Sequence, residues 1–519
     1  MKKTRFRQLF IILIAVPCLS FSQEKYISFE EIEFDSPLQR KVLKEISDGE
    51  GTEVFDAFLV IATEDSSSFE KWKVFYEKEM EVLKNRKPQK KLAKDVKNIY
   101  DNLHEKFLRK YEYVAYFDQI FENGVYNCVT AVALYAMSFE RLGISYSIKE
   151  TPTHVYIVAD PEDSQLLIET TDPVSGFKTF SPGFKENYVA QLAMMKLVDQ
   201  SDVSDKGLYT LFDEFYFGGA DLSLKQLVGI QFYNLGVSAL ENNDYYSAWR
   251  ALSKAQLFHS TDQIDRLLFV SIANVLSGSD YANWEDVKLL PYLHRFEEFD
   301  VKKTNVVGEF ARMLNFVLVN NNDTEKAEKA FDYFVTNTTS DELIKEVTFL
   351  YNYERSRLAY NRANYKESFE FITKGYEAKP GNADAEALLT GSFQMAYVNK
   401  STTEALSTLD TLMTQNEELE KNNHFNTMRM NLYLSKMGED FDNRKSTSGT
   451  RLKELFEKTI AENPDYLYDR NILSNAYSKA AVYYFKRGYT TKARGIIQSG
   501  LELVPDSYEL KSRLRMISR

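Results

Sequence analysis

The sequence predicts an α+β domain followed by an all-α array of paired helices. Three observations predict this fold class. A compact helical pattern is followed by three short apolar or alternating stretches of the kind that form strands. From about residue 225 to the end, no convincing strand pattern occurs and helical patterns come in pairs. The 519 residues also exceed what one ordinary core requires, at roughly 150 residues per domain.

The first 22 residues have the pattern of a secretory signal peptide. Four basic residues among the first seven precede the apolar run 9–17, and the small residues Ser20 and Ser22 follow it. This run is too short to cross a bilayer as a helix, which takes roughly 20 apolar residues. We therefore expect cleavage after Ser22 and an exported protein, periplasmic or extracellular. A lipid anchor at Cys18 is the alternative, although Pro17 directly before it fits a lipoprotein cleavage site poorly.

Charge and composition exclude several classes of function. The chain has 64 basic and 76 acidic side chains, and loss of the four basic leader residues leaves 60 against 76, a net charge of −16. A protein that binds the phosphate backbone needs a basic face, so no nucleic-acid partner is expected. No other window is apolar enough for a transmembrane segment. No group of His, Cys and carboxylate residues has metal-ligand spacing, so no metal or other cofactor is expected.

The chain is expected to divide into four parts after the leader. Residues 23–90 form an N-terminal helical extension, and residues 91–200 form the α+β domain. A linker follows over 201–224, and residues 225–519 form the helical array. The α+β domain opens with an amphipathic helix over 90–109, whose apolar residues recur near helical spacing: Leu92, Val96, Tyr100, Leu103 and Phe107.

A second helix is predicted over 128–142, ended by Gly143, which suits a left-handed C-terminal cap. Three strands are predicted after it, over 144–149, 154–159 and 165–170. The turn Pro161-Glu-Asp-Ser164 joins the last two strands into an antiparallel hairpin centred between Glu162 and Asp163.

Cys128 is the only cysteine left once the leader is removed, so no internal disulfide can form. It lies at the predicted first turn of a helix, where free backbone N–H groups and the helix dipole favour a thiolate. The same N–H groups can donate to an oxyanion on an attacked carbonyl. Cys128 is therefore a candidate nucleophile. The alternative is a small buried apolar residue, which free cysteine often is.

His154 is the candidate base for this nucleophile. It begins a predicted strand 26 residues after Cys128, and an imidazole on a sheet beside the helix N-terminus can accept the thiol proton. A third group has to hold the imidazole tautomer. In the predicted hairpin His154 faces Thr171, and Glu169 lies diagonally on the same face, so Glu169 is the first choice and Asp172 the second.

These motifs resemble a known family. Tyr126-Asn-Cys-Val-Thr-Ala131, then Pro152-Thr-His-Val-Tyr-Ile157, then Leu167-Ile-Glu-Thr-Thr-Asp-Pro173 are similar to the transglutaminase-like branch of papain-fold cysteine enzymes. The resemblance covers roughly residues 95–185. It implies Cys128 as nucleophile, His154 as base, and Glu169 or Asp172 as orienting acid. The sequence departs from the family in having Tyr156 in place of the commoner Trp and Glu in place of the usual Asp.

The helical array contains three stretches with a shared pattern: Gly229–Asp262, Phe349–Asn382 and Ser474–Ser507. Small residues recur where two helices have to approach closely, and a proline follows the second helix in the last two stretches. The pattern resembles the 34-residue tetratricopeptide repeat (TPR). The stretches begin 120 and 125 residues apart, which are not multiples of 34, so insertions or irregular helix pairs are expected between them. A generic helical bundle is the alternative.

Two functions follow from these resemblances. The first is an exported, thiol-dependent acyl-transfer enzyme, with amide or peptide hydrolysis through a Cys128 thioester favoured, whose TPR-like array binds a protein or peptide. The second is a non-catalytic interaction scaffold that carries a degenerate transglutaminase-like domain. Both functions imply protein or peptide partners.

Overall fold

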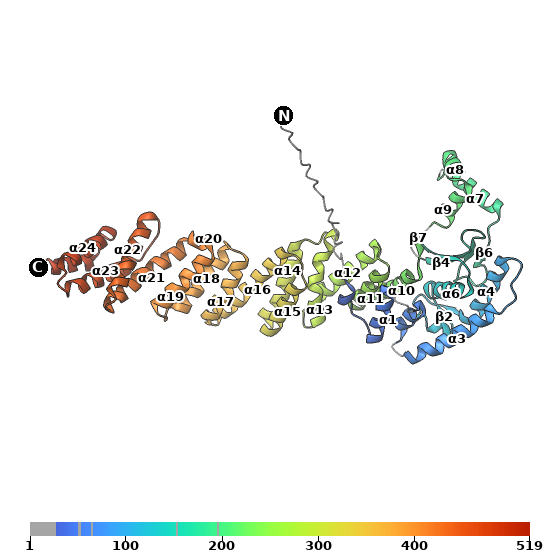
Figure 1. Cartoon of the computed structure of the whole chain (residues 1–519), viewed down its shortest axis with the longest axis horizontal. Coiled ribbons are helices and arrows are strands. Elements are labelled where there is room, and N and C mark those ends of the chain that lie inside the picture. Colours follow the sequence, from blue (N-terminus) through green and yellow to red (C-terminus); the bar gives the residue numbers. More distant parts are fainter. Residues whose placement is uncertain are drawn as a thin grey trace, which may run out of the picture. The chain divides into compact units, whose positions relative to one another are not determined.

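The structure is a computed structural model that describes residues 27–49, 53–63, 66–151, 154–194, 197–218 and 220–518. The signal peptide expected over 1–22 and the possible anchor at Cys18 lie outside the described residues. A mixed α+β region with a small antiparallel sheet is followed by a long all-helical region of packed helix pairs (Figure 1). The chain forms two compact units. The first runs to Ser279 and includes Tyr292–Val301; the second comprises Asp280–Pro291 and Lys302–Arg519.

The N-terminal helices belong to the main core of the first unit. They are η1 (Phe29–Glu31), α1 (Pro37–Asp48), α2 (Val54–Ala62), α3 (Ser66–Lys84) and α4 (Leu92–Phe107). Aromatic rings join them to the short helix α5 (Gln119–Glu122): Phe55 meets Phe117 edge-on at 5.3 Å between centroids, and Trp72 stacks on Phe121 at 5.8 Å. The segment expected as an extension is thus part of the α+β core.

Helix α6 (Cys128–Leu142) is the centre of this core. Every residue from Val129 to Phe139 is buried, so the helix is apolar on all sides and is enclosed by its neighbours. Gly143 caps its C-terminus with φ of 70°, the left-handed conformation that glycine adopts without a Cβ clash. The predicted bounds of this helix and its stop at Gly143 are confirmed.

The sheet has five antiparallel strands in the order β6-β5-β4-β3-β7. They are β3 (Tyr146–Thr151), β4 (His154–Ala159), β5 (Leu166–Ile168), β6 (Phe177–Lys178) and β7 (Ala220–Leu222). In the β4–β5 hairpin Ile157 pairs with Ile168, which is the register of a hairpin centred between Glu162 and Asp163. Helix α6 packs on one face of the sheet, where Ile148 and Ile157 are fully buried. A separate parallel pair, β1 (Lys110–Tyr111) and β2 (Val125–Tyr126), precedes α6.

Three helices cover the opposite face of the sheet. The segment that forms them includes residues 201–224, where the sequence predicted a linker. The segment holds α7 (Pro182–Met194), α8 (Gln200–Lys206) and α9 (Leu208–Tyr216), and then β7, which pairs with β3 through Ile148 and Leu222. An apolar cluster joins these helices to Tyr156, Val158 and Leu167. Strand β7 has three residues, too few for an alternating pattern to show. Its partner β3 lies about 70 residues earlier, so the sequence pattern did not indicate this strand.

The first helices after the sheet also belong to the first unit: α10 (Leu224–Glu241), α11 (Tyr245–Phe258) and α12 (Asp262–Gly278). Glycines let α10 and α11 approach closely. A Cβ added at Gly236 would lie 2.6 Å from Leu252 Cγ, and one added at Gly229 would lie 2.7 Å from His259 Cβ. Gly236 is at a position where the repeat pattern places small residues, equivalent to Ser356 and Ala481 in the other two stretches.

The second unit is all helical among the residues described. Its elements are α13 (Trp284–Leu289), α14 (Lys303–Leu314), η3 (Asn315–Asn320), α15 (Thr324–Thr336), α16 (Asp341–Asn361), α17 (Tyr365–Ala378), α18 (Ala383–Tyr397), α19 (Thr402–Gln415), α20 (Glu417–Glu420), α21 (Asn423–Asp442), α22 (Ser446–Glu462), α23 (Arg470–Phe485), α24 (Thr490–Leu503) and α25 (Tyr508–Ile517), with η2 (Leu290–Phe299) continuing into the first unit. The stretches at 349–382 and 474–507 fall on the pairs α16–α17 and α23–α24. Within the described ranges, no helix is both long and apolar enough to cross a membrane.

Candidate active site

Cys128 is the first residue of α6 and lies partly exposed at the edge of the core. Asn127 caps the helix: its side-chain oxygen accepts a hydrogen bond from the Thr130 N–H at 2.9 Å, and the Thr130 hydroxyl accepts one from the Asn127 N–H at 3.0 Å. The N–H groups of Cys128 and Val129 have no acceptor within the helix, because the first turn of a helix has none to offer. They are therefore oriented to donate to an anion beside the Cys128 sulfur.

Asn127 also fixes the start of α6 to the loop between β1 and α5. Its buried amide donates to the carbonyl oxygens of Tyr113 at 3.3 Å and Ala115 at 3.4 Å. The Ala115 carbonyl accepts a second hydrogen bond from Gln231 Nε2 of α10 at 2.8 Å. The loop that precedes the cysteine helix is thus held from both sides.

We expect Asn127→Ala to lower the free energy of unfolding by about 2 kcal/mol, since it removes a helix cap and the amide that holds the loop. We also expect slower alkylation of Cys128, because the first turn of α6 loses its anchor. Thermal unfolding and the rate of reaction with iodoacetamide measure the two effects. Asn382→Ala is the matched control, since Asn382 caps α18 in the same way. If both variants lose stability and Cys128 reacts at the parent rate in both, Asn127 does not position the thiol.

His154 and Glu169 are bonded to each other. His154 Nε2 lies 2.8 Å from each carboxylate oxygen of Glu169, and both side chains are about three-quarters buried. Thr171 donates to the same carboxylate through its hydroxyl at 2.7 Å and its N–H at 3.2 Å. Because Nε2 faces Glu169, Nδ1 is the ring nitrogen left to exchange a proton with another group.

The surroundings of this pair favour its charged form. The Cys128 thiol is the largest influence on the imidazole, and together with Glu169 it raises the pKa of His154 to about 10, against the effect of burial. Burial raises the pKa of Glu169, but hydrogen bonds from His154 and Thr171 outweigh it and hold that pKa below its ordinary value. An imidazolium beside a cysteine sulfur stabilises a thiolate.

Asp172 lies near this group but faces elsewhere. One of its carboxylate oxygens accepts hydrogen bonds from the N–H groups of Ser175 at 2.9 Å and Val174 at 3.1 Å, which close the turn after β5. Gly176 ends that turn, and a Cβ there would lie 2.1 Å from the Glu169 carbonyl oxygen. Of the two acids proposed from the sequence, Glu169 is the one whose carboxylate bonds His154. Gly176, which was not singled out from the sequence, is required for the turn.

Cys128 and His154 open into a cavity of about 600 Å³ in the first unit. One wall comes from Tyr111, Tyr113 and the β3–β4 hairpin, and the other from α10 and the start of α12. His259, at the C-terminus of α11, and Glu150 of β3 both line this cavity and bond each other, with Nε2 to oxygen distances of 3.1 and 3.3 Å. Sequence reasoning did not connect His259 with the site, because no local pattern indicates that the first helix pair packs against the hairpin.

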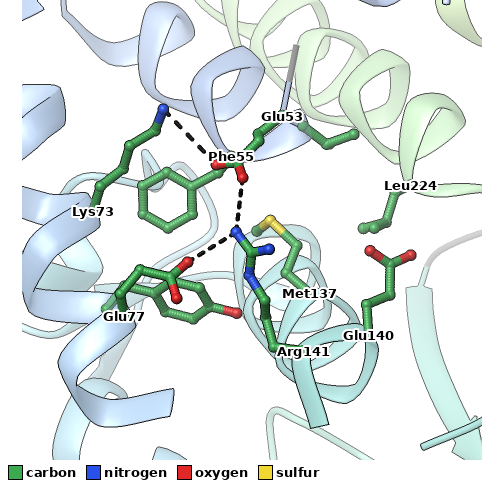
Figure 2. Close-up of a pocket in the computed structure, with 10 residues that line it drawn as sticks. Glu53, Phe55, Lys73, Glu77, Met137, Glu140, Arg141 and Leu224 are labelled. Atoms are coloured by element: carbon green, nitrogen blue, oxygen red, sulfur yellow. Dashed lines mark hydrogen bonds and ion pairs between the residues drawn. The ribbon is translucent and has the colours of Figure 1, made fainter. Parts of the chain in front are cut away.

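A second cavity, of about 320 Å³, lies at the other end of α6. Figure 2 shows Arg141 directed between Glu53 and Glu77, with nitrogen to oxygen distances of 2.7 and 2.8 Å. Lys73 pairs with Glu53 from the neighbouring helix. These ion pairs tie α3 and the start of α2 to the C-terminus of α6. Because Arg141 and Lys73 are paired with Glu53 and Glu77, and Glu140 accepts a hydrogen bond from Tyr146, we assign this cavity a structural role.

Within the described residues, no three His, Cys, Asp or Glu side chains gather as a metal site requires. No protein-family model matches the sequence, and no curated protein matches it.

Proposed function

We propose that this protein is a thiol-dependent acyl-transfer enzyme in which Cys128 is the nucleophile, His154 the base and Glu169 the acid that orients the imidazole. The observation that carries the proposal is the position of His154. Its Nε2 is bonded by Glu169, and its pKa is raised to about 10, with Cys128 as the first cause. His154 is thus held by a carboxylate and lies in the same cavity as the thiol at the start of α6, which is the arrangement that a cysteine nucleophile requires.

The reaction follows from these positions. Cys128 Sγ attacks a carbonyl carbon and His154 holds the thiol proton, while the free N–H groups at the start of α6 donate to the oxyanion. The carbon–nitrogen bond breaks, the proton passes from His154 to the leaving amine, and a thioester remains on Cys128. Water or a second amine then attacks the thioester, gives its proton to His154, and the thiolate leaves. We favour hydrolysis of amides or peptides.

We further propose that the packed helix pairs are TPR-like and bind a protein or peptide partner, and that the protein is exported. Support for the repeat assignment comes from the small residues between paired helices. Gly375 lies against Asn352, and Gly500 lies against Tyr477, at equivalent places in two pairs. A partner-binding array in the same chain as a cysteine enzyme is a way to hold an extended substrate.

The nucleophile is tested with 4-nitrophenyl acetate on the full chain carrying Cys18→Ala, in which Cys128 is the only thiol. We expect one acetyl group per chain in quenched samples, located on Cys128 by mass spectrometry, and a burst of one equivalent of 4-nitrophenolate before slower turnover. His154→Ala should slow acetylation roughly 100-fold, since it removes the base. Cys128→Ser is the control for acetylation elsewhere. Acetylation of Cys128 at the rate of a free thiol, unchanged by His154→Ala, would favour the scaffold that carries a degenerate domain.

A further inference from the structure

The cavity beside Cys128 has a lining with a definite chemical character. Three tyrosines line it: Tyr111 and Tyr113 on the side of the α+β domain, and Tyr233 on α10. Tyr111 and Tyr113 are 46% and 52% exposed, so their rings are accessible from the cavity. Tyr111 is held by Tyr126, which meets it edge-on at 5.8 Å between centroids. Burial, and then Cys128, raise the pKa of Tyr111, so its ring stays uncharged close to the sulfur.

Glu150 is the carboxylate of this cavity. It pairs with Val155 across the β3–β4 hairpin, one position from the pair of Thr151 with His154. Successive pairs alternate between the faces of a hairpin, but the pair of Thr151 with His154 lies at its end, and both Glu150 and His154 line the cavity. Its side chain keeps 29% of its surface exposed, whereas its partner His259 keeps 8%. A carboxylate that served only to tie β3 to α11 would not need an exposed surface in the cavity.

The described lining residues include Glu150 but neither lysine nor arginine. His259 Nε2 lies 3.1 and 3.3 Å from the two Glu150 oxygens, and the carboxylate keeps part of its surface exposed beside this contact. Tyrosine ring faces attract cations, and a carboxylate next to them adds a direct charge interaction. The His154 imidazolium also lines the cavity, but it is already paired with Glu169. An anionic group would therefore meet Glu150 with neither lysine nor arginine to balance it. The lining thus selects for positive charge.

We propose that this cavity is a subsite for a positively charged group of the substrate, a primary ammonium or guanidinium as in lysine or arginine side chains. Glu150 binds the charge, and the rings of Tyr111, Tyr113 and Tyr233 surround it. The inference deepens the proposed function, on which it rests for the statement that the bound group belongs to an acyl substrate. It adds that the scissile carbonyl is presented to Cys128 by a basic segment of a peptide or protein.

Charged thiol reagents test the subsite without a known substrate. The full chain with Cys18→Ala is treated with two methanethiosulfonates, one carrying an ethylammonium group and one an ethylsulfonate group. The Cys128 thiolate attacks the reagent's sulfenyl sulfur, a disulfide forms, and methanesulfinate leaves. For each charged reagent, the rate with Cys128 is first divided by the rate with the uncharged methyl reagent. The same ratio is measured for free cysteine, and the first ratio is divided by the second. This normalisation removes the intrinsic reactivity of the reagents and of the thiol.

We expect the cationic reagent to be preferred, and Glu150→Gln to reduce that preference roughly fivefold to tenfold, as for a charge a few ångströms away in a partly solvated site. Glutamine can still accept a hydrogen bond from His259. Tyr113→Leu should reduce the preference about twofold to fivefold, because it removes one ring face. Glu241→Gln is the matched control. This exposed carboxylate lies near enough to influence Tyr113 but does not line the cavity.

Two results would overturn the subsite. One is an equal preference for both reagents in the parent chain. The other is the same loss of preference in Glu241→Gln as in Glu150→Gln, which would assign the effect to the overall negative charge. Neither result concerns the nucleophile, since a slow reaction with the uncharged reagent tests the proposed function separately. Circular dichroism of each variant confirms that a lost preference is not a lost fold.

Discussion

Iodoacetamide should alkylate Cys128 rapidly even at about pH 6, at a rate about 100-fold above that of free cysteine, whose thiolate is well under 1% populated there with a pKa near 8.5. The reason is the charge beside the sulfur. The pKa of His154 is raised to about 10, so the imidazole is protonated at neutral pH, and its positive charge stabilises the thiolate. The rate should depend weakly on pH between about 6 and 9. Mass spectrometry of the chain carrying Cys18→Ala gives the rate directly.

His154→Ala is the decisive variant in this experiment, because it removes the imidazolium and leaves Cys128 in place. Its alkylation should regain the steep pH dependence of an ordinary thiol. The raised pKa also has a consequence for stability. Protonation of His154 stabilises the folded chain fully below the unfolded pKa of about 6.5, and this contribution is lost as the pH rises through about 10. If the parent and His154→Ala share one pH profile, no cysteine–imidazole pair exists.

The second large effect is expected at Glu169. Glu169→Gln should slow alkylation and acetylation of Cys128 at about pH 6 roughly tenfold or more, because the imidazole loses the carboxylate that orients it toward the sulfur. Glutamine keeps the size of the side chain and one hydrogen-bond acceptor, so the loss reports the charge. The rate as a function of pH should show that the histidine titrates at lower pH in this variant.

Asp172→Asn is the matched control for this variant. Its carboxylate bonds the backbone of Val174 and Ser175, and asparagine can accept the same hydrogen bonds. We expect the reactivity of Cys128 to change less than about twofold, since an exposed charge is screened by solvent. A tenfold loss in Asp172→Asn, with Glu169→Gln near the parent rate, would assign the orienting role to Asp172.

Local patterns in the sequence were sufficient to predict the helix and the strands that carry the candidate residues. The helix from Cys128 to Gly143 was predictable because its apolar run and its glycine stop both act within a few residues. The β4–β5 register was predictable because a short turn fixes which residues face each other. That register brought Glu169 within reach of His154, so Glu169 could be preferred over Asp172 before any coordinates were known. The catalytic role of these residues remains a prediction.

Contacts between segments far apart in the chain were decided by the tertiary structure alone. The strand β7 joins β3 at the sheet edge, Gln231 holds the loop before Cys128, and His259 reaches Glu150 over 109 residues. None of these contacts is indicated by a periodic pattern or a capping motif in the sequence, because each depends on how two secondary-structure elements pack. The sequence by itself therefore determined the helices, the hairpin and the candidate nucleophile. Tertiary packing decided what surrounds the nucleophile, since a cavity wall is built by whichever distant element the core brings to it.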